Sequence, residues 1–451
     1  MELKDMRVLV AGSGKSGIGA VSLLQKVGAD ITLYDGNETL TEELVKEKLD
    51  NSEGVKFVFG NLPSEVINNI DLMVLSPGIA IDAPFVNEVR DAGVEIWGEI
   101  ELAYRVAKGK LIAITGTNGK TTTTALVGEI MANYFKKVDV VGNIGNPYTT
   151  TAFESDEDTV TVAEISSFQL ETIHEFKPDV TAVLNITPDH LNRHYTMDNY
   201  ANVKMSISKN QDENQVMVLN YEDEIIREKA ASIKNKIVYF SSKRALEEGV
   251  YLEGDNIIYS MDGKKEMITT VFDTSLVGIH NTENIMAAIA ISINMGVPKD
   301  VIRESIKEFK AVEHRIEYVT TINDVVYYND SKGTNTDASI KAIEAMSRPT
   351  VLIAGGYDKK SEFDEWVEAF GDKIKCLVLL GATKDKIAET AKRHGFDNII
   401  MTESLEEAVK VSAQNAEPNY AVLLSPACAS WDMFDSYEQR GELFKRFVKN
   451  L

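Results

Sequence analysis

A chain of 451 residues, 44% hydrophobic and 26% charged, is long enough to form about two to four globular domains. Its formal net charge of -23 disfavours binding of nucleic acid or an anionic membrane over most of the surface, so anionic ligands would need locally positive pockets. No apolar run is long enough to cross a bilayer, no secretory segment surrounds the first apolar run, and both cysteines lie in or beside apolar runs. We therefore expect a cytoplasmic protein, monomeric, with no nucleic-acid partner and no membrane insertion.

Residues 7–35 predict the start of a Rossmann-like domain. A strand runs into the turn Gly12–Gly17, a helix ends near Gly28, and a second strand ends at Asp35. A G-x-G-x-x-G turn after a strand, with an acidic residue ending the next strand, is typical of dinucleotide-binding units. The alternative, that these glycines only let a helix pack close to a strand, remains open.

A further strand at 71–75 runs into Ser76-Pro77-Gly78. Loops at the carboxyl edge of a parallel sheet are where such folds bind ligands. We therefore expect Ser13, Gly14, Asp35, Ser76 and Gly78 to bind a ligand, in a first domain that ends near Trp97.

The stretch Gly116-Thr117-Asn118-Gly119-Lys120-Thr121 predicts a phosphate-binding loop. It follows the apolar run 111–115 and precedes a helical pattern, so its backbone N–H groups and the helix N-terminus can face an anion. Lys120 can reach the outer phosphates, and the Thr121 hydroxyl can hold Mg²⁺. The loop is not a full Walker A motif, because Ile114 stands where its first glycine belongs.

The middle of the chain predicts a mostly parallel sheet followed by hairpins in 250–275. The expected strands are 111–115, 138–142, 160–165, 180–186, 215–219 and 236–240. Glu164 ends one strand and could bind Mg²⁺, although a solvated strand-end glutamate is an equal alternative. His190 could bind a metal or a phosphate oxygen or be structural, and Lys204 on its own pattern is a surface lysine.

The last third predicts a second doubly wound α/β domain beginning near Val312. Its expected strands are 325–329, 350–354, 376–380, 398–401 and 421–425. Arg315 and Lys332 could neutralise phosphate charge, and Asp330 could bond a ribose hydroxyl. The alternative for each is a surface ion pair.

The motifs together resemble the Mur ligases over nearly the whole chain. They occur in one order: GTNGKTT, EISSFQLE, NITPDHLNRH, GIHNTEN, EHRIE, NDSKGTN and LLSPACASWDMFDSYEQRGELF. The resemblance implies a Rossmann-like UDP-binding domain at 1–98, a central P-loop ATPase-type domain at 99–311, and a C-terminal Rossmann-like domain at 312–451. Asn118, the SSFQLE run and the LLSPACAS segment favour the D-glutamate-adding branch of the family.

The resemblance further implies an activity. ATP would phosphorylate the carboxylate of UDP-N-acetylmuramoyl-L-alanine, and D-glutamate would attack the acyl phosphate, releasing ADP and phosphate in peptidoglycan precursor synthesis. The cofactor would be Mg²⁺, as two ions. An NAD-linked dehydrogenase led by the first glycine turn, and a non-catalytic nucleotide-binding scaffold, are the alternatives.

The resemblance also implies residue roles. Residues expected at ATP are Gly116, Thr117, Asn118, Gly119, Lys120, Thr121, Thr122, Asn281, Asn284, Arg315 and Asp330. Those expected at the UDP-substrate are Ser13, Gly14, Asp35 (toward uracil), Ser76, Gly78, Asn143, Ser166 and His190. Those expected at D-glutamate are Thr334, Lys359, Ser425 and Phe434. Expected metal ligands are Thr121, Glu164, His190 and Lys204, the last as a carbamate, and expected catalytic residues are Lys120, Glu164, His190, Lys204 and Lys332.

Overall fold

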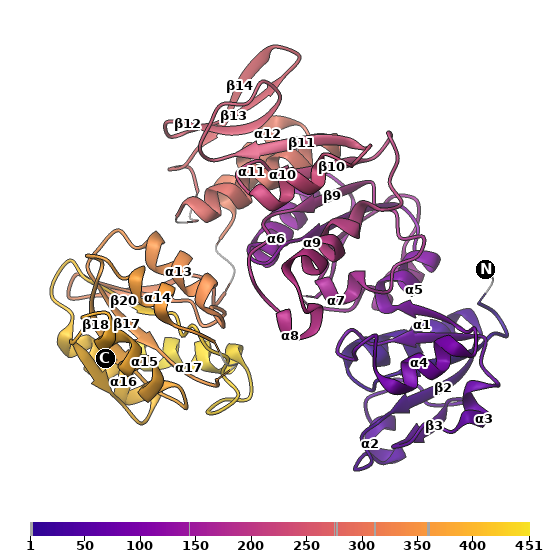
Figure 1. Ribbon diagram of the computed structural model, residues 1–451. Coiled ribbons are helices and arrows are strands. Elements are labelled where there is room, and N and C mark those ends of the chain that lie inside the picture. Colours follow the sequence, from indigo (N-terminus) through magenta and orange to yellow (C-terminus); the bar gives the residue numbers. More distant parts are fainter. Residues whose placement is uncertain (1–2, 144, 275, 277, 311–312, 359–360) are drawn as a thin grey trace. The chain divides into compact units, whose positions relative to one another are not determined.

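The computed structural model describes residues 3–143, 145–274, 276, 278–310, 313–358 and 361–451. The chain forms three α/β sheets, which can be followed by colour in Figure 1. Backbone contacts divide it into two compact units, residues 1–271 with 283–307 and residues 272–282 with 308–451. Among the described residues, none of the helices combines the length and apolar character that a membrane span requires.

The N-terminal sheet is parallel throughout, in the order β3-β2-β1-β4-β5. Its strands are β1 (Arg7–Ala11), β2 (Asp30–Asp35), β3 (Lys56–Phe59), β4 (Leu72–Leu75) and β5 (Glu95–Gly98). Its helices are α1 (Lys15–Val27), α2 (Glu42–Lys46), α3 (Ser64–Ile67) and α4 (Pro84–Asp91), with α5 (Glu99–Val106) leading onward. The strand order reverses between β1 and β4, so the loops after these strands open a crevice. The Rossmann-like prediction is confirmed, although β3 and β5 were not predicted.

The central sheet is built around β6 and has the order β14-β13-β12-β11-β10-β9-β6-β8-β7. Its strands are β6 (Lys110–Thr115), β7 (Lys137–Gly142), β8 (Thr159–Glu164), β9 (Val180–Val183), β10 (Val216–Asn220), β11 (Lys236–Ser241), β12 (Gly249–Glu253), β13 (Asn256–Met261) and β14 (Lys264–Thr270). Pairing is parallel from β7 to β12 and antiparallel across the two predicted hairpins, β12–β13 and β13–β14. β6 is largely apolar, and both β6 and β8 are buried almost throughout, as expected of strands covered on both faces.

The helices of the central region are α6 (Lys120–Ala132), α7 (Ser167–Leu170), α8 (Leu191–His194), α9 (Met197–Met205), α10 (Glu224–Ala230), α11 (Ile279–Asn294) and α12 (Lys299–Glu308). Most of them follow parallel strands, whereas α11 and α12 come after the antiparallel hairpins. Because β6 lies between β8 and β9, the loops that leave these three strands meet at one edge. That edge carries the predicted phosphate loop, Glu164 and the stretch containing His190.

The C-terminal sheet has the order β15-β16-β20-β17-β18-β19. Its strands are β15 (Glu317–Ile322), β16 (Val325–Asn329), β17 (Thr350–Ala354), β18 (Ile374–Leu379), β19 (Ile399–Met401) and β20 (Ala421–Leu424). Its helices are α13 (Thr336–Ala345), α14 (Asp364–Glu368), α15 (Lys384–Arg393), α16 (Leu405–Asn415) and α17 (Tyr437–Lys449). One core packs under α13–α15 and another under α16 and α17, so the predicted doubly wound layering is confirmed.

β15 was not predicted. It is the antiparallel edge strand, mostly half-exposed and interrupted by a bulge near Tyr318, so it lacks the apolar run by which its neighbours are recognised. The domain bounds 1–98, 99–311 and 312–451 stay a prediction.

Candidate active site

The phosphate loop connects β6 to α6 and depends on two glycines with left-handed backbones. Gly116 has φ 153° and Gly119, which caps α6, has φ 84°. A Cβ at Gly119 would stand 2.3 Å from Oδ1 of Asn284 on α11. Glycine is therefore required both by the backbone angle and by the close approach of α11. The resulting turn presents backbone N–H groups at a helix N-terminus, which is a geometry suited to an anion.

Asn185, directly after β9, braces this loop from the neighbouring strand. Its Oδ1 accepts from the Asn118 backbone N–H at 2.8 Å, and its Nδ2 donates to the Asn118 carbonyl at 3.0 Å. The Asn185 carbonyl accepts from the Thr117 N–H at 2.9 Å. The Thr117 hydroxyl in turn lies 3.1 Å from the Tyr200 hydroxyl on α9. The loop backbone is thus bonded to Asn185 after β9, and the Thr117 side chain contacts α9.

Two lysines meet at one carbonyl of the loop. Lys120 Nζ donates to the carbonyls of Gly116 and Thr117, each at 2.8 Å, and Lys204 Nζ donates to the Gly116 carbonyl at 2.7 Å. Lys204 is 2% exposed, so the expectation of a surface lysine is wrong. Burial and the nearby charge of Lys120 hold the pKa of Lys204 well below its usual value, while Asp189 and Glu164 act in the opposite direction. The site therefore favours a neutral Lys204 amine.

Glu164 ends β8 and is also buried, with 1% exposed. Asn143 Nδ2 donates to its Oε1 at 2.7 Å, whereas Oε2 is enclosed and finds no hydrogen-bond partner among the described residues. The solvated strand-end alternative is wrong. A buried carboxylate oxygen without a donor is costly, and a cation would satisfy it, so the residue fits a metal ligand. The Thr121 hydroxyl, in the first turn of α6, supplies a second oxygen at this edge.

His190 lies on the turn after β9 and is exposed, with a left-handed backbone at φ 53°. Its ring packs 4.8 Å from the Phe168 ring of α7, and its Nε2 lies 3.4 Å from Asp189 Oδ2. Ser166, the N-cap of α7, is engaged with Gln169 in a capping box. The ends of β7, β8 and β9 thus bring Asn143, Ser166 and His190 to the same sheet edge as the phosphate loop.

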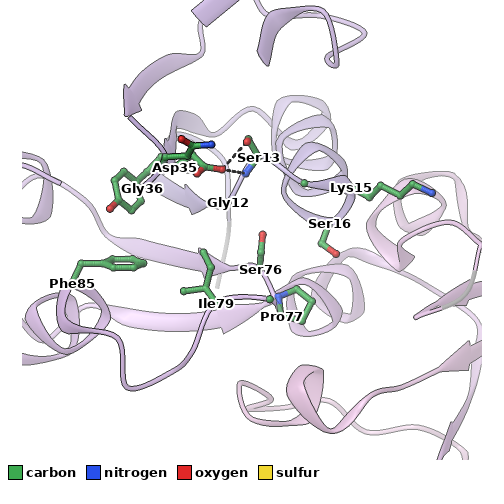
Figure 2. A pocket seen from close by; sticks show the side chains of 14 residues that line it. Gly12, Ser13, Lys15, Ser16, Asp35, Gly36, Ser76, Pro77, Ile79 and Phe85 are labelled. Carbon is green, nitrogen blue, oxygen red and sulfur yellow. Dashed lines mark hydrogen bonds between the residues drawn. The ribbon is translucent and has the colours of Figure 1, made fainter. Parts of the chain in front are cut away.

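The first glycine turn forms one wall of a cavity of about 460 Å³ in the N-terminal domain. Figure 2 shows Ser13 and Asp35 pointing toward one another, with Ser76 and Ile79 on the loop after β4. All five residues predicted here from the sequence line the cavity: Ser13, Gly14, Asp35, Ser76 and Gly78. A Cβ at Gly17 would stand 1.8 Å from the Gly12 carbonyl, so the close packing of α1 on the turn requires glycine there, whereas a Cβ at Gly14 would meet nothing within 4 Å.

Asp35 holds this turn in shape. Its Oδ2 accepts from the Ser13 N–H at 2.9 Å and from the Ser13 hydroxyl at 2.6 Å, and its Oδ1 accepts from the Asn37 N–H at 3.0 Å. Although partial burial opposes ionisation, these hydrogen bonds keep the pKa of Asp35 below its usual value. The carboxylate is thus an anchor for the turn that forms the pocket wall.

In the C-terminal unit, the loops after β16 and β20 meet at Asp330 and Ser425. The Ser425 hydroxyl donates to Asp330 Oδ2 at 2.8 Å and lies 2.9 Å from the Ser339 hydroxyl. Asp330 is buried, and burial raises its pKa to about 6 against the opposing charge of Arg315. Asp330 is therefore not part of a surface ion pair. Lys332 and Thr334 continue the same loop, with Lys332 Nζ 5.3 Å from the Tyr437 ring.

With this geometry described, comparison with known proteins identifies the family. Three family models match: "Mur ligase MurD-like, N-terminal domain" over residues 6–98, "Mur ligase middle domain" over 114–292, and "Mur ligase, glutamate ligase domain" over 314–428. The chain belongs to the Mur ligase family.

Relatives and structures agree with this assignment. A UDP-N-acetylmuramoylalanine--D-glutamate ligase of Lachnospira eligens is 57% identical, and one of Clostridioides difficile is 46% identical, each over 100% of both chains. The fold is similar to the Thermotoga maritima ligase MurC, at 20% identity and TM-score 0.62 over 99% of this chain and 100% of that one. It is equally similar to the T. maritima MurF ligase in complex with ADP, at 17% identity and TM-score 0.62 over 100% of this chain and 96% of that one.

The family assignment decides how the first glycine turn of this Mur ligase is understood. Residues 6–98 match a Mur ligase domain, so the turn belongs to that family's N-terminal domain, and the dehydrogenase alternative receives no support. The three Mur ligase domain models likewise give no support to a non-catalytic nucleotide-binding scaffold.

The structure shows positions and contacts that sequence patterns did not indicate, both for residues expected at the site and for others. Asn284 lies against the phosphate loop, and Asn281 is buried on the same helix. Phe434 packs against the core under α16 and α17, and Lys359 lies outside the described residues. The role of Asn185 in bracing the phosphate loop was not predicted, although a polar residue after a parallel strand is the usual sign of a site residue. Arg440, buried and donating to the Ser331 hydroxyl at 2.9 Å, was missed because it lies within a helix pattern.

Proposed function

We propose that this Mur ligase joins D-glutamate to UDP-N-acetylmuramoyl-L-alanine in peptidoglycan precursor synthesis, consuming ATP and releasing ADP and phosphate. The observation that carries the proposal is the phosphate loop facing two buried ionisable groups, Glu164 and Lys204, in a chain with full-length relatives of that name. We further propose that it acts in the cytoplasm as a monomer.

The chemistry explains why such a site is needed. A carboxylate is a poor acyl donor, because its charge repels an amine and oxide is a poor leaving group. Attack of a carboxylate oxygen on the γ-phosphorus breaks the bond to ADP and forms an acyl phosphate. The neutral amine of D-glutamate then attacks the carbonyl carbon, loses a proton, and the tetrahedral intermediate expels phosphate as the amide forms. Positioning and charge neutralisation account for most of the rate enhancement in phosphoryl transfer.

We assign the phosphates of ATP to the loop Gly116–Thr122. The backbone N–H groups would bind phosphate oxygens, and Lys120 would exchange the carbonyls of Gly116 and Thr117 for the outer phosphates. Asn281 and Asn284 are assigned to adenine, Asp330 to ribose, and Arg315 with Lys332 to phosphate charge.

We assign Mg²⁺ to Thr121, Glu164, His190 and a carbamylated Lys204, as two ions. The unpartnered Oε2 of Glu164 supports this fit. A carbamate forms when a neutral amine bonds to the carbon of CO₂ and releases a proton, and the lowered pKa of Lys204 favours that amine. When bound, Mg²⁺ supplies positive charge to phosphate oxygens.

The remaining assignments concern the two other substrates. For the UDP-sugar we assign the pocket residues Ser13, Gly14, Asp35, Ser76 and Gly78, with Asn143, Ser166 and His190 toward the muramoyl part. For D-glutamate we assign Thr334, Lys359, Ser425 and Phe434.

An amino-acid panel tests this function. Phosphate release is measured with UDP-N-acetylmuramoyl-L-alanine, ATP and Mg²⁺, adding D-glutamate, L-glutamate, L-alanine or glycine in turn. Of the four amino acids, we expect only D-glutamate to give phosphate release above background, and only when the UDP-sugar is also present. Added NAD should not change the release. Equal release without the UDP-sugar, or a preference for another amino acid, would refute the proposal.

A further inference from the structure

Arg193, on the one-turn helix α8 of the central domain, reaches into the loop that lines the N-terminal pocket. Its Nη1 donates to the Pro77 carbonyl and its Nη2 to the Ile79 carbonyl, both at 2.9 Å. Pro77 and Ile79 themselves line the pocket, opposite the first glycine turn. A side chain from one domain thus holds two backbone carbonyls of the ligand loop of the other, and both lie within the same compact unit.

The Arg193 guanidinium is fixed in this position from two further directions. Nη2 is paired with Glu171 Oε2, whose side chain is 5% exposed, and the guanidinium carbon lies 4.2 Å from the centre of the Phe168 ring. Arg193 is itself only 14% exposed. Glu171 and Phe168 both belong to the α7 segment that follows β8. A planar guanidinium can stack flat on a ring while its fixed fork of N–H groups donates to oxygens in the same plane, and a lysine ammonium has no such planar face.

The turn that carries Arg193 is a short, strained segment. Helix α8 has four residues and is bracketed by His190 at φ 53° and Tyr195 at φ 66°, both left-handed and neither of them glycine. Such a segment has little stability of its own and persists only where its surroundings hold it. The Tyr195 hydroxyl donates to Asp82 Oδ2 at 2.6 Å, which is a second bond from this turn to the N-terminal domain.

The same turn presents His190, three residues before Arg193. The Phe168 ring contacts both, since it lies 4.8 Å from the His190 ring as well as under the guanidinium. A change in the Pro77–Ile79 loop therefore moves the anchor of the His190–Tyr195 segment, which has no independent rigidity. This segment carries His190 at the phosphate edge, which is the edge of the central sheet that holds the phosphate loop and Glu164.

We propose that Arg193 is a positioning residue that couples the Ser76–Ile79 wall of the N-terminal pocket to the His190 turn, so that filling the pocket orders the phosphate edge. The inference rests on the proposed function only for the identity of the ligand, a uridine nucleotide. Without Arg193 the pocket and the phosphate edge would respond to ligand separately.

Amide hydrogen exchange with and without UDP tests this coupling without any turnover. In the unmodified protein, UDP should lower the amide exchange rate by about tenfold or more in the peptides that cover residues 190–195, because filling the pocket stabilises the anchored turn. In Arg193→Ala, protection should remain in the pocket peptides and disappear from the turn. Arg193→Lys, which keeps the charge beside Glu171, should recover part of it.

Arg90→Ala is the matched control. Arg90 also donates to a backbone carbonyl next to this loop, that of Ile81 at 2.8 Å, but it belongs to the N-terminal domain itself. It should behave as the unmodified protein. UDP protection of the turn that persists in Arg193→Ala, or that is absent from the unmodified protein, would overturn the inference.

Steady-state kinetics separate this inference from the proposed function. Arg193→Ala should raise KM for the UDP-sugar and lower kcat, each about tenfold, with KM for ATP changed less than about twofold. A purely structural loss would lower the active fraction and leave both KM values unchanged. If the unmodified protein ligates no D-glutamate, the proposed function fails, while the exchange result still decides the role of Arg193.

Discussion

Two glycine turns of this chain have the same local form and face different charges. Gly12–Gly17 and Gly116–Lys120 each connect a parallel strand to the N-terminus of a helix at the carboxyl edge of a sheet. The first is anchored by the carboxylate of Asp35, and the second is bounded by Lys120 and Lys204, which share the Gly116 carbonyl. The same type of backbone turn therefore forms a pocket beside an acid in one domain and, in the other, an edge where two lysine amines meet at one carbonyl.

The difference comes only in part from the turns, because Lys120 belongs to the second turn whereas Asp35 and Lys204 lie outside both. Asp35 ends β2, next to β1, whereas Glu164 ends β8 and Asn185 follows β9, on the two sides of β6. Substitutions on each side of this comparison should therefore affect different substrates.

Lys120→Ala should have the largest effect. Removing the side chain that reaches the outer phosphates should reduce kcat by about a thousandfold or more, because charge neutralisation at the transferring phosphoryl group is lost. UDP binding measured by calorimetry should stay unchanged, since the first turn is intact. Lys136→Ala, an exposed lysine after α6, serves as the control, and substantial turnover by Lys120→Ala would remove the second turn from the mechanism.

Lys204→Ala should come next, with kcat reduced by about a hundredfold or more through loss of the metal-binding carbamate. A small carboxylic acid such as formate or acetate, added to the assay, should restore part of the activity by occupying the vacated space as an anion. Full activity of the alanine variant without any added acid would contradict the carbamate assignment.

Glu164→Gln keeps the shape of the side chain and the bond from Asn143 but removes the charge. We expect the Mg²⁺ concentration for half-maximal turnover to rise about tenfold, since a carboxylate ligand is replaced by an amide. Glu99→Gln is the comparison, because Glu99 is buried in the same unit and, like Glu164, has a bonded Oε1 and an enclosed Oε2 without a partner among the described residues, but it lies at the start of α5 and is bonded to Thr149. Equal Mg²⁺ dependence in both variants would mean that Glu164 is not a ligand.

Asp35→Asn should have the smallest effect of these substitutions, a loss of folding stability that arises in the first glycine turn. The pKa of Asp35 is lower in the folded protein than in the unfolded chain, where it is about 4, so the carboxylate stabilises the fold above about pH 4. This stabilisation is lost as the pH falls through the pKa of the folded state. The variant should lose about 1 kcal/mol or less at pH 7, because the group is partly exposed, with the difference vanishing in acid. Denaturant unfolding at pH 7 and at stepwise lower pH measures this, and a constant difference would exclude the carboxylate as its cause.

Patterns along the chain were sufficient to predict the three α/β sheets and the motifs at the ends of their strands. β6, β17 and β20 contain continuous apolar runs because both of their faces are covered, and such runs are visible without a structure. The edge strands β3 and β15 are partly exposed and lack that pattern. Residues that follow central strands, such as Asp35, Glu164 and Asp330, were found because the carboxyl edge of a parallel sheet gathers them.

Burial and long-range contact could not be read from the same patterns. Lys204 occupies an ordinary helix position, and only the fold shows that it is enclosed beside a carbonyl from a loop 88 residues earlier. Arg193 likewise looks like a surface residue until its carbonyl partners, more than 100 residues away, are known.

The amino-acid sequence by itself determined the three α/β layers, the two glycine turns and the order of the motifs, because these depend on local periodicity and on backbone angles that only certain residues adopt. The tertiary structure alone decided which charges face each turn, that Lys204 is buried beside Lys120, and that Arg193 joins two domains. Those properties depend on solvent exclusion and on distances between segments remote in the chain, which no local pattern encodes.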